Sequence, residues 1–252
     1  SWQMTTSYSS SYFKRAKKTM GQMFVFKSFI LDLLFPMFCF GCNKEGSLLC
    51  DACVPALRVV PPQCFVCGKL APSPVGRTCV SCCKKSHIFG FLSPFMYQQE
   101  IVRMMIHAFK YEGMKSLAPF FAEHIFHYVQ KYGALPADTL FIPIPLRPKR
   151  RRARGFNQAE LIAVRLGKLT GIFVDTTILK KVKDTVPQAS LSAQDRRCNL
   201  EGSFQISARA EIKRKTIILV DDVKTTGVTL EEAARVLKKA GAKEIWAITI
   251  AH

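Results

Sequence analysis

The stretch that decides the fold is Ile217–Thr229, IILVDDVKTTGVT, an apolar run that ends in two aspartates and a short polar turn. The apolar run Thr216–Val220 is typical of a buried strand. A helix is expected to begin at Thr229, with Glu232 as its capping-box partner, and the apolar segment Glu244–Ala251 predicts a further strand. Strand, helix and strand at this spacing predict a βαβ unit with parallel strands, and therefore an α/β fold with helices flanking a parallel sheet.

The polar turn carries the residue types of a ribose-phosphate site. Asp221 and Asp222 follow the strand directly, at the sheet edge where open α/β folds bind ligands. Their carboxylates can accept hydrogen bonds from ribose hydroxyls, or hold Mg²⁺ directly or through its waters. Threonine hydroxyls and N–H groups at a helix N-terminus favour an anion, and Gly227 lets the backbone turn tightly around a phosphate. The alternative is an ordinary strand-to-helix loop.

The segment Val220–Thr229, VDDVKTTGVT, resembles the phosphoribosylpyrophosphate (PRPP) motif of type I phosphoribosyltransferases. The resemblance implies the Rossmann-like fold of that family, with PRPP as ligand and Mg²⁺ bound with it. It assigns Asp221 and Asp222 to the ribose hydroxyls, as the candidate catalytic residues. The PRPP-binding residues of the turn are then completed by Lys224, which stands at a variable position of the motif, and by Thr225, Thr226, Gly227 and Thr229.

A basic segment follows another strand-type run, Thr139–Ile144. Its charged residues are Arg147, Lys149, Arg150, Arg151, Arg152 and Arg154. Guanidinium forks match phosphate oxygens, and a lysine ammonium binds them as a point charge, so Lys149 and Arg154 are candidates for holding the pyrophosphate of PRPP. Arg150, Arg151 and Arg152 are candidates for contacting a nucleic-acid backbone. A solvated loop is the alternative, although the net charge of +19 favours polyanionic partners for the chain as a whole.

Nine of the ten cysteines lie between Cys39 and Cys83, and eight of them form four CxxC pairs. Clustered pairs without a convincing secretory signal indicate metal ligands in a reducing compartment. We expect one closed, structural zinc site at Cys39, Cys42, Cys50 and Cys53, and a second at Cys64, Cys67, Cys79 and Cys82. A redox-active pair and ligand sharing between the pairs are the alternatives. Cys83 and Cys198 remain as inert thiols.

The chain is expected to divide into three regions. Residues 1–38 form a leader with an amphipathic helix around Phe24–Leu34, residues 39–85 form the cysteine module, and residues 88–252 form the α/β domain. The apolar segment Met23–Phe38 is too short and too interrupted by charge to span a bilayer. We therefore expect a cytoplasmic protein without a transmembrane segment, and a basic amphipathic helix that can lie on the inner face of the membrane.

Several separate motifs together resemble the ComF-type competence protein family, which has relatives linked to gluconate utilisation. They are the cysteine module, Phe109-Lys110-Tyr111, the RGFNQ segment Arg154–Gln158, and the stretch from Gln188 to Phe204. The resemblance runs from about Leu33 to the C-terminus. It implies a zinc-finger-like module joined to a phosphoribosyltransferase domain, and a role in DNA uptake during natural transformation. Single-stranded DNA and other competence proteins are the implied partners.

Two other functions stay open for a chain with these motifs. One is an active phosphoribosyltransferase of nucleotide salvage, and the other is a zinc-ribbon nucleic-acid adaptor with a vestigial pocket. A salvage enzyme normally carries a base-recognition segment after its phosphate loop, whereas here the sequence reaches His252 soon after the last strand. We therefore expect a PRPP-binding accessory protein of DNA uptake, with base recognition from upstream segments if catalysis occurs.

Overall fold

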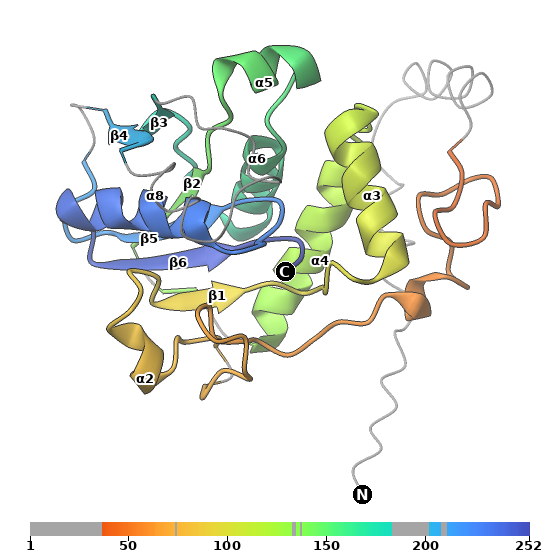
Figure 1. The fold of residues 1–252 in the computed structure, drawn as a ribbon. Helices are drawn as coiled ribbons and strands as arrows, with labels where there is room; N and C mark the ends of the chain where they lie inside the picture. Colours follow the sequence, from red (N-terminus) through yellow and green to blue (C-terminus); the bar gives the residue numbers. More distant parts are fainter. Residues whose placement is uncertain (1–36, 74, 133–134, 137, 183–201, 208–210) are drawn as a thin grey trace, which may run out of the picture. The chain divides into compact units, whose positions relative to one another are not determined.

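A computed structural model describes residues 37–73, 75–132, 135–136, 138–182, 202–207 and 211–252. The chain forms two compact units, residues 1–54 and 55–252 (Figure 1). In the first unit, the described residues form a cysteine-rich loop closed by a bridge between Phe38 and Glu45, and the short 3-10 helix η2 (Val54–Ala56) follows. The predicted helix at Phe24–Leu34 lies outside the described residues, and the predicted region boundaries stay predictions.

The second unit is built on four parallel strands in the order β1-β6-β5-β2. They are β1 (Gly90–Leu92), β2 (Thr139–Pro143), β5 (Thr216–Val220) and β6 (Glu244–Ile248). Every residue of β5 is buried, as expected for a central parallel strand that is covered on both faces. The predicted βαβ unit is confirmed, because β5 pairs in parallel with β6.

Helices cover both faces of this sheet, as Figure 1 shows. They are α3 (Glu100–Tyr111), α4 (Leu117–Tyr132), α6 (Gln158–Thr170) and α8 (Val228–Lys239). Leu230, Ala233 and Leu237 of α8 pack in one hydrophobic cluster with Ile217 and Leu219 of β5. Helix α6 contacts β2 and β5 but contributes nothing to that cluster. Because neighbouring strand residues point to opposite faces, α6 covers the other face, and it packs against α4.

The expected capping box at the start of α8 is wrong. The helix begins at Val228, and Gly227 occupies the N-cap position with a φ of +78°. The Glu232 carboxylate is only 8 % exposed and accepts hydrogen bonds from the Gly202 N–H at 2.9 Å and from the Arg235 guanidinium at 2.7 Å. Helix α8 packs against β4 (Phe204–Ile206), which follows Gly202 and pairs antiparallel with β3 (Leu179–Lys181). This packing directs the carboxylate to a partner that is distant in the sequence.

The basic segment is a short helix, α5 (Pro148–Arg154), where the sequence suggested a turn or a solvated loop. Arg147 before it is extended, as a residue preceding proline should be, and Pro148 starts the helix with its preset φ. Gly155 ends the helix in the left-handed region, with a φ of +74°. The remaining short helix, α2 (Val80–Cys83), lies within the cysteine-rich segment.

Candidate functional site

A pocket of about 230 Å³ lies where β5 meets α8. The turn between these elements forms most of its wall, and residues of the segment before β2 complete it. The lining residues are Tyr97, Lys110, Asp221, Val223, Lys224, Thr225, Thr226, Gly227, Val228, Thr229 and Leu230. Six of the seven turn residues that the sequence predicts for PRPP therefore share one pocket. The seventh, Asp222, is connected to the pocket through Lys110.

The chain after β6 holds the start of the turn in place. The Asp221 N–H donates to the Ile248 carbonyl at 3.0 Å, and the Lys224 N–H donates to the Ala251 carbonyl at 3.0 Å. The Asp222 carbonyl accepts from the Ile250 N–H at 2.9 Å. These bonds continue the β5–β6 pairing past the ends of both strands, so the conformation of the turn depends on the last residues of the sequence.

The middle of the turn leaves backbone donors available. Within the described residues, the N–H groups of Thr225, Thr226 and Gly227 make no hydrogen bond to a backbone carbonyl. They precede the first turn of α8, where the helix dipole also favours negative charge. The Lys224 side chain also lines the pocket, and its Nζ lies 5.2 Å from the centre of the Phe65 ring. The turn thus offers an anion site made of backbone donors and threonine hydroxyls.

The two aspartates have different surroundings. The Asp222 carboxylate accepts a hydrogen bond from Lys110 Nζ at 2.7 Å, and both side chains are less than a fifth exposed. Burial opposes the charge of Lys110, but the adjacent Asp222 carboxylate outweighs that effect and raises the Lys110 pKa. Burial and the negative charge of Asp222 raise the pKa of Asp221 to about 7, although Lys110 and Lys181 oppose the rise. Asp222 is thus paired, whereas Asp221 titrates near neutrality.

Lys181 at the end of β3 links the site to the basic segment. Burial, together with the positive charges of Arg147 and Arg150, lowers its pKa to about 8, although the negative charge of Asp221 opposes the fall. Arg147 and Arg150 therefore lie close enough to Lys181 to act on its charge. This places part of the predicted basic segment near the Asp221 side of the pocket.

The other predicted basic residues have separate positions. The Arg154 guanidinium lies 5.0 Å from the centre of the Tyr111 ring, and its charge acts on Lys110, a pocket residue. Arg151 forms an ion pair with Glu160 of α6 at 3.3 Å. Lys149 and Arg152 are exposed, and no described contact joins them to the pocket. Of the two residues predicted for the pyrophosphate, the structure brings only Arg154 close to the site.

Sequence reasoning missed four residues at this site: Lys110 as the partner of Asp222, Lys181, Tyr97 and Phe65. Lys110 lies in the Phe109-Lys110-Tyr111 motif, and this motif could have indicated that Lys110 belongs to the site. Lys181 belongs to a run of lysines with no distinguishing pattern, and Tyr97 lies in a loop. These residues approach the turn only through the packing of elements that are far apart in the sequence.

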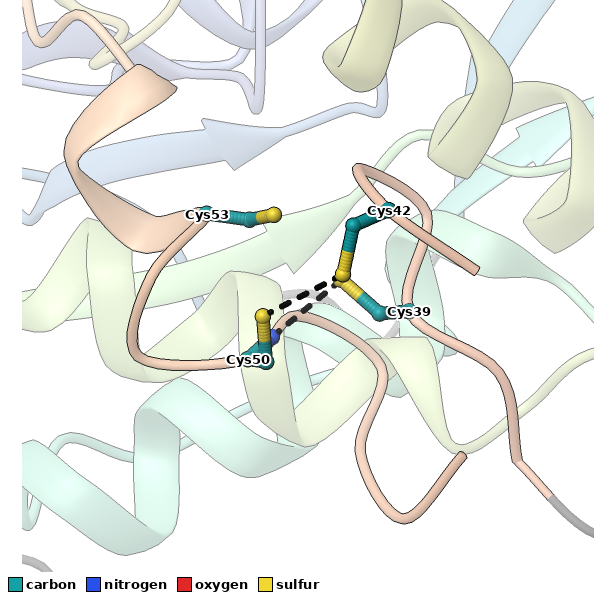
Figure 2. Close-up of side chains that lie close together, drawn as sticks. All are labelled: Cys39, Cys42, Cys50 and Cys53. Atoms are coloured by element: carbon teal, nitrogen blue, oxygen red, sulfur yellow. Dashed lines mark hydrogen bonds between the residues drawn. The ribbon is translucent and has the colours of Figure 1, made fainter. Parts of the chain in front are cut away.

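The first cysteine cluster consists of Cys39, Cys42, Cys50 and Cys53, whose sulfur atoms all lie within 4.8 Å of one another (Figure 2). The N–H groups of Gly41 and Cys50 donate to Cys39 Sγ at 3.4 and 3.3 Å. The Cys50 N–H, with the other backbone donors, lowers the Cys39 pKa to about 6. Four convergent sulfurs with one already favoured as thiolate fit a tetrahedral zinc site.

The second cluster consists of Cys64, Cys67, Cys79 and Cys82, also with all sulfurs within 4.8 Å of one another. Cys79 Sγ lies 3.6 Å from Cys64 Sγ and 3.9 Å from Cys67 Sγ. A hydrogen bond from Ser81, together with those from neighbouring thiols, lowers the Cys79 pKa to about 6. The nine described cysteines are all free thiols, so both clusters are compatible with zinc. Cys83 Sγ donates to the Val80 carbonyl at 3.0 Å, and Cys198 lies outside the described residues.

No helix among the described residues combines the length and apolar character needed to cross a membrane. The apolar segment Met23–Phe38, to which the expectation about a membrane span referred, lies largely outside the part of the chain that the structure describes. The predicted surface contact of the leader with a membrane concerns residues outside that part.

Comparisons with known proteins identify one family domain and several relatives of this chain. Residues 153–252 match the family described as "Phosphoribosyl transferase domain". Competence protein F of Haemophilus influenzae is 31 % identical over 206 residues, which cover 80 % of this chain and 88 % of that protein. DNA utilization protein YhgH of Salmonella typhi is 27 % identical over 225 residues, or 86 % of this chain and 98 % of that one. Competence protein ComFC of Streptococcus pneumoniae is 28 % identical, covering 81 % and 87 %.

Proposed function

The chain belongs to the ComF-type competence protein family, and from this premise we propose that it binds PRPP at the Asp221–Thr229 turn while it acts in DNA uptake. One observation carries the proposal: Asp221 and backbone donors before α8 share a single pocket, and Asp222 is joined to that pocket through Lys110. Carboxylates suit the ribose hydroxyls, and the N–H groups suit the 5′-phosphate.

The charges around the pocket suit a ligand that carries phosphate at both ends. The 5′-phosphate takes the N–H groups of Thr225, Thr226 and Gly227, and Arg154 is the nearest predicted basic residue for the pyrophosphate. A volume of about 230 Å³ is below the roughly 300–1,000 Å³ of common small-molecule sites. We therefore expect the ribose 5-phosphate part to fill the pocket and the pyrophosphate to extend from it.

The aspartate pair also fits Mg²⁺, a hard cation that prefers carboxylate and phosphate oxygens. Asp221 and Asp222 are the residues that would hold it, directly or through water. When bound with PRPP, Mg²⁺ neutralises charge on the pyrophosphate. Lys110 forms an ion pair with Asp222 at 2.7 Å. Its positive charge therefore offsets part of the repulsion between the two carboxylates when no metal is bound.

Calorimetry of the full chain with PRPP, with and without Mg²⁺, tests this proposal. We expect PRPP to bind more strongly in the presence of Mg²⁺. We also expect an Asp221→Ala, Asp222→Ala variant to lose this binding. The matched control is Glu123→Ala, which removes a carboxylate on α4 that pairs with Arg165 away from the pocket. An absence of binding at millimolar PRPP would refute the ligand assignment. Wild-type transformation in cells that carry the double variant would separate the pocket from DNA uptake.

The DNA contact is proposed for the exposed side of α5. Arg150, Arg151 and Arg152 are exposed there, and phosphate contacts by arginine are independent of sequence. The free thiols of the cysteine clusters support a reducing, cytoplasmic location, and zinc is the metal that the two clusters fit best. Contact with other competence proteins and with the inner face of the membrane belongs to the same proposal.

Active phosphoribosyl transfer is a second candidate, which the raised pKa of Asp221 favours. A carboxylate that titrates at about 7 is suited to accept a proton from an incoming acceptor at neutral pH. Asp222, held by Lys110, would then stabilise positive charge on the ribose. A pyrophosphate-release assay across free nucleobases distinguishes the two. Release that depends on one base, and that Asp221→Asn abolishes, would establish the enzyme.

A further inference from the structure

The second cysteine cluster contacts the turn Asp221–Thr229, called the phosphate turn below, through an aromatic side chain. Phe65 lies in the chain between the ligand cysteines Cys64 and Cys67, and it is only 5 % exposed. A Cβ atom added at Gly227 would meet its Cζ at 2.8 Å, so ring and turn are in direct contact. Only glycine accommodates both this contact and the φ of +78°.

Phe65 also orders the charged part of the turn. The Lys224 ammonium lies 5.2 Å from the centre of the Phe65 ring and 5.5 Å from that of Phe91, within the range of a cation–π contact. The two rings meet edge to face at a centroid distance of 5.6 Å. The aromatic pair therefore supports the turn at Gly227 and holds the Lys224 side chain to one side of it.

The far end of the cluster reaches the same helix by a second route. Four residues after Cys82, the Ser86 hydroxyl donates to the Glu231 carboxylate at 2.6 Å. The His87 N–H donates to the same carboxylate at 2.7 Å. Glu231 lies in the first turn of α8, directly after the phosphate turn. The second cluster is thus connected to the anion site at two places in the chain. One is Phe65, which precedes Cys67, and the other is Ser86 with His87, which follow Cys82.

We propose that metal binding at Cys64, Cys67, Cys79 and Cys82 is coupled to ligand binding at the phosphate turn, with Phe65 as the positioning residue that transmits the coupling. This rests on the proposed function, because PRPP is the ligand considered. The segment around Phe65 is a short hairpin, held by hydrogen bonds from Cys64 N–H to Lys69 O, Gly68 N–H to Cys64 O and Ala71 N–H to Pro62 O, and by a bridge between Gln63 and Leu70. Metal coordination fixes such a segment, and with it the ring that supports the turn.

Coupling between two sites is reciprocal: the metal strengthens PRPP binding by the same factor as PRPP strengthens metal binding. A phenylalanine that merely fills the core does not produce this reciprocity. The structure therefore predicts an effect in each direction. The loss of metal from the second cluster should weaken PRPP binding, and bound PRPP should raise the zinc affinity of that cluster.

The first experiment measures PRPP affinity by calorimetry for the zinc-loaded chain and for Cys79→Ser, with zinc content determined for each. We expect Cys79→Ser to lose one zinc and about tenfold in affinity, within the roughly 5- to 150-fold typical of coupled sites. Cys42→Ser is the matched variant in the other cluster and should keep the wild-type affinity. Equal losses in the two variants, or no loss in either, would overturn the proposal.

A second variant keeps the metal ligands intact. Phe65→Leu preserves an apolar side chain but removes the ring under Gly227, and Phe121→Leu makes the same change at a buried phenylalanine of α4. We expect weaker PRPP binding with normal zinc content for Phe65→Leu alone. The share of zinc that a chromogenic chelator removes at equilibrium should fall with PRPP in the wild type and be insensitive to it in Phe65→Leu. A share that ignores PRPP in the wild type would refute the coupling, whereas a wild type that binds no PRPP would refute the proposed function instead.

Discussion

Replacing Asp221 by asparagine should stabilise the protein at neutral and alkaline pH while it weakens ligand binding. Burial and the neighbouring Asp222 charge raise the pKa of Asp221 to about 7 from the ordinary 3.8. The folded state thus binds a proton at this carboxylate more tightly than the unfolded state does. Ionisation of Asp221 therefore destabilises the folded protein, as is common where a functional site conflicts with stability.

The size of the effect follows from the two pKa values. Each tenfold change in proton affinity corresponds to about 1.4 kcal/mol, so the difference between 3.8 and about 7 corresponds to about 4 kcal/mol. Because the folded pKa is the higher one, this free energy is lost gradually as the pH rises from about 4 to about 7. Asp221→Asn removes this pH-dependent loss of stability. The free energy of unfolding of the variant should therefore exceed that of the wild type only slightly at pH 4, and by about 4 kcal/mol above pH 7.

Urea denaturation of both proteins between pH 4.5 and pH 8.5 measures this difference, with PRPP calorimetry on the same samples. Glu112→Gln is the matched control, because its carboxylate is 59 % exposed, and it should change the free energy of unfolding by at most about 0.5 kcal/mol at every pH. Parallel stability curves for wild type and Asp221→Asn would show that Asp221 ionises normally and would refute the reasoning.

Three further outcomes are expected. Lys110→Met leaves the mostly buried Asp222 carboxylate without its partner and should lower the free energy of unfolding by about 3 kcal/mol in urea, whereas an unchanged midpoint would mean that the ion pair contributes nothing. Replacement of the three central arginines of α5 by alanine should weaken binding to single-stranded DNA and flatten its dependence on salt, with a slope reduced by about 2 on a log–log plot; an identical slope would exclude α5 from the DNA surface. Glu231→Gln replaces the charged acceptor of Ser86 and His87 with a neutral one, and should cost about 1 kcal/mol, measured as a lower thermal midpoint.

Local patterns predicted most of the sheet and its principal site. Thr216–Val220 is recognisable as a buried strand because all five of its residues are apolar or β-branched, and the aspartates that follow it must lie at the sheet edge. The regular CxxC spacing likewise predicted both cysteine clusters, since a two-residue gap lets two thiols bind one metal ion. Where a neighbour distant in the sequence competes with a local rule, prediction failed. Glu232 was expected to cap its own helix and instead binds Gly202 and Arg235.

The sequence alone determined that the chain has a parallel α/β sheet, a turn suited to ribose phosphate and two sets of four cysteines, because each depends on residues close together in the chain. Only the tertiary structure decided what surrounds the turn. Lys110 neutralises one aspartate, burial changes the pKa of the other, and Phe65 supports Gly227 from within the second cluster. Desolvation, Coulomb interactions and packing depend on distances in space, which spacing along the chain does not specify.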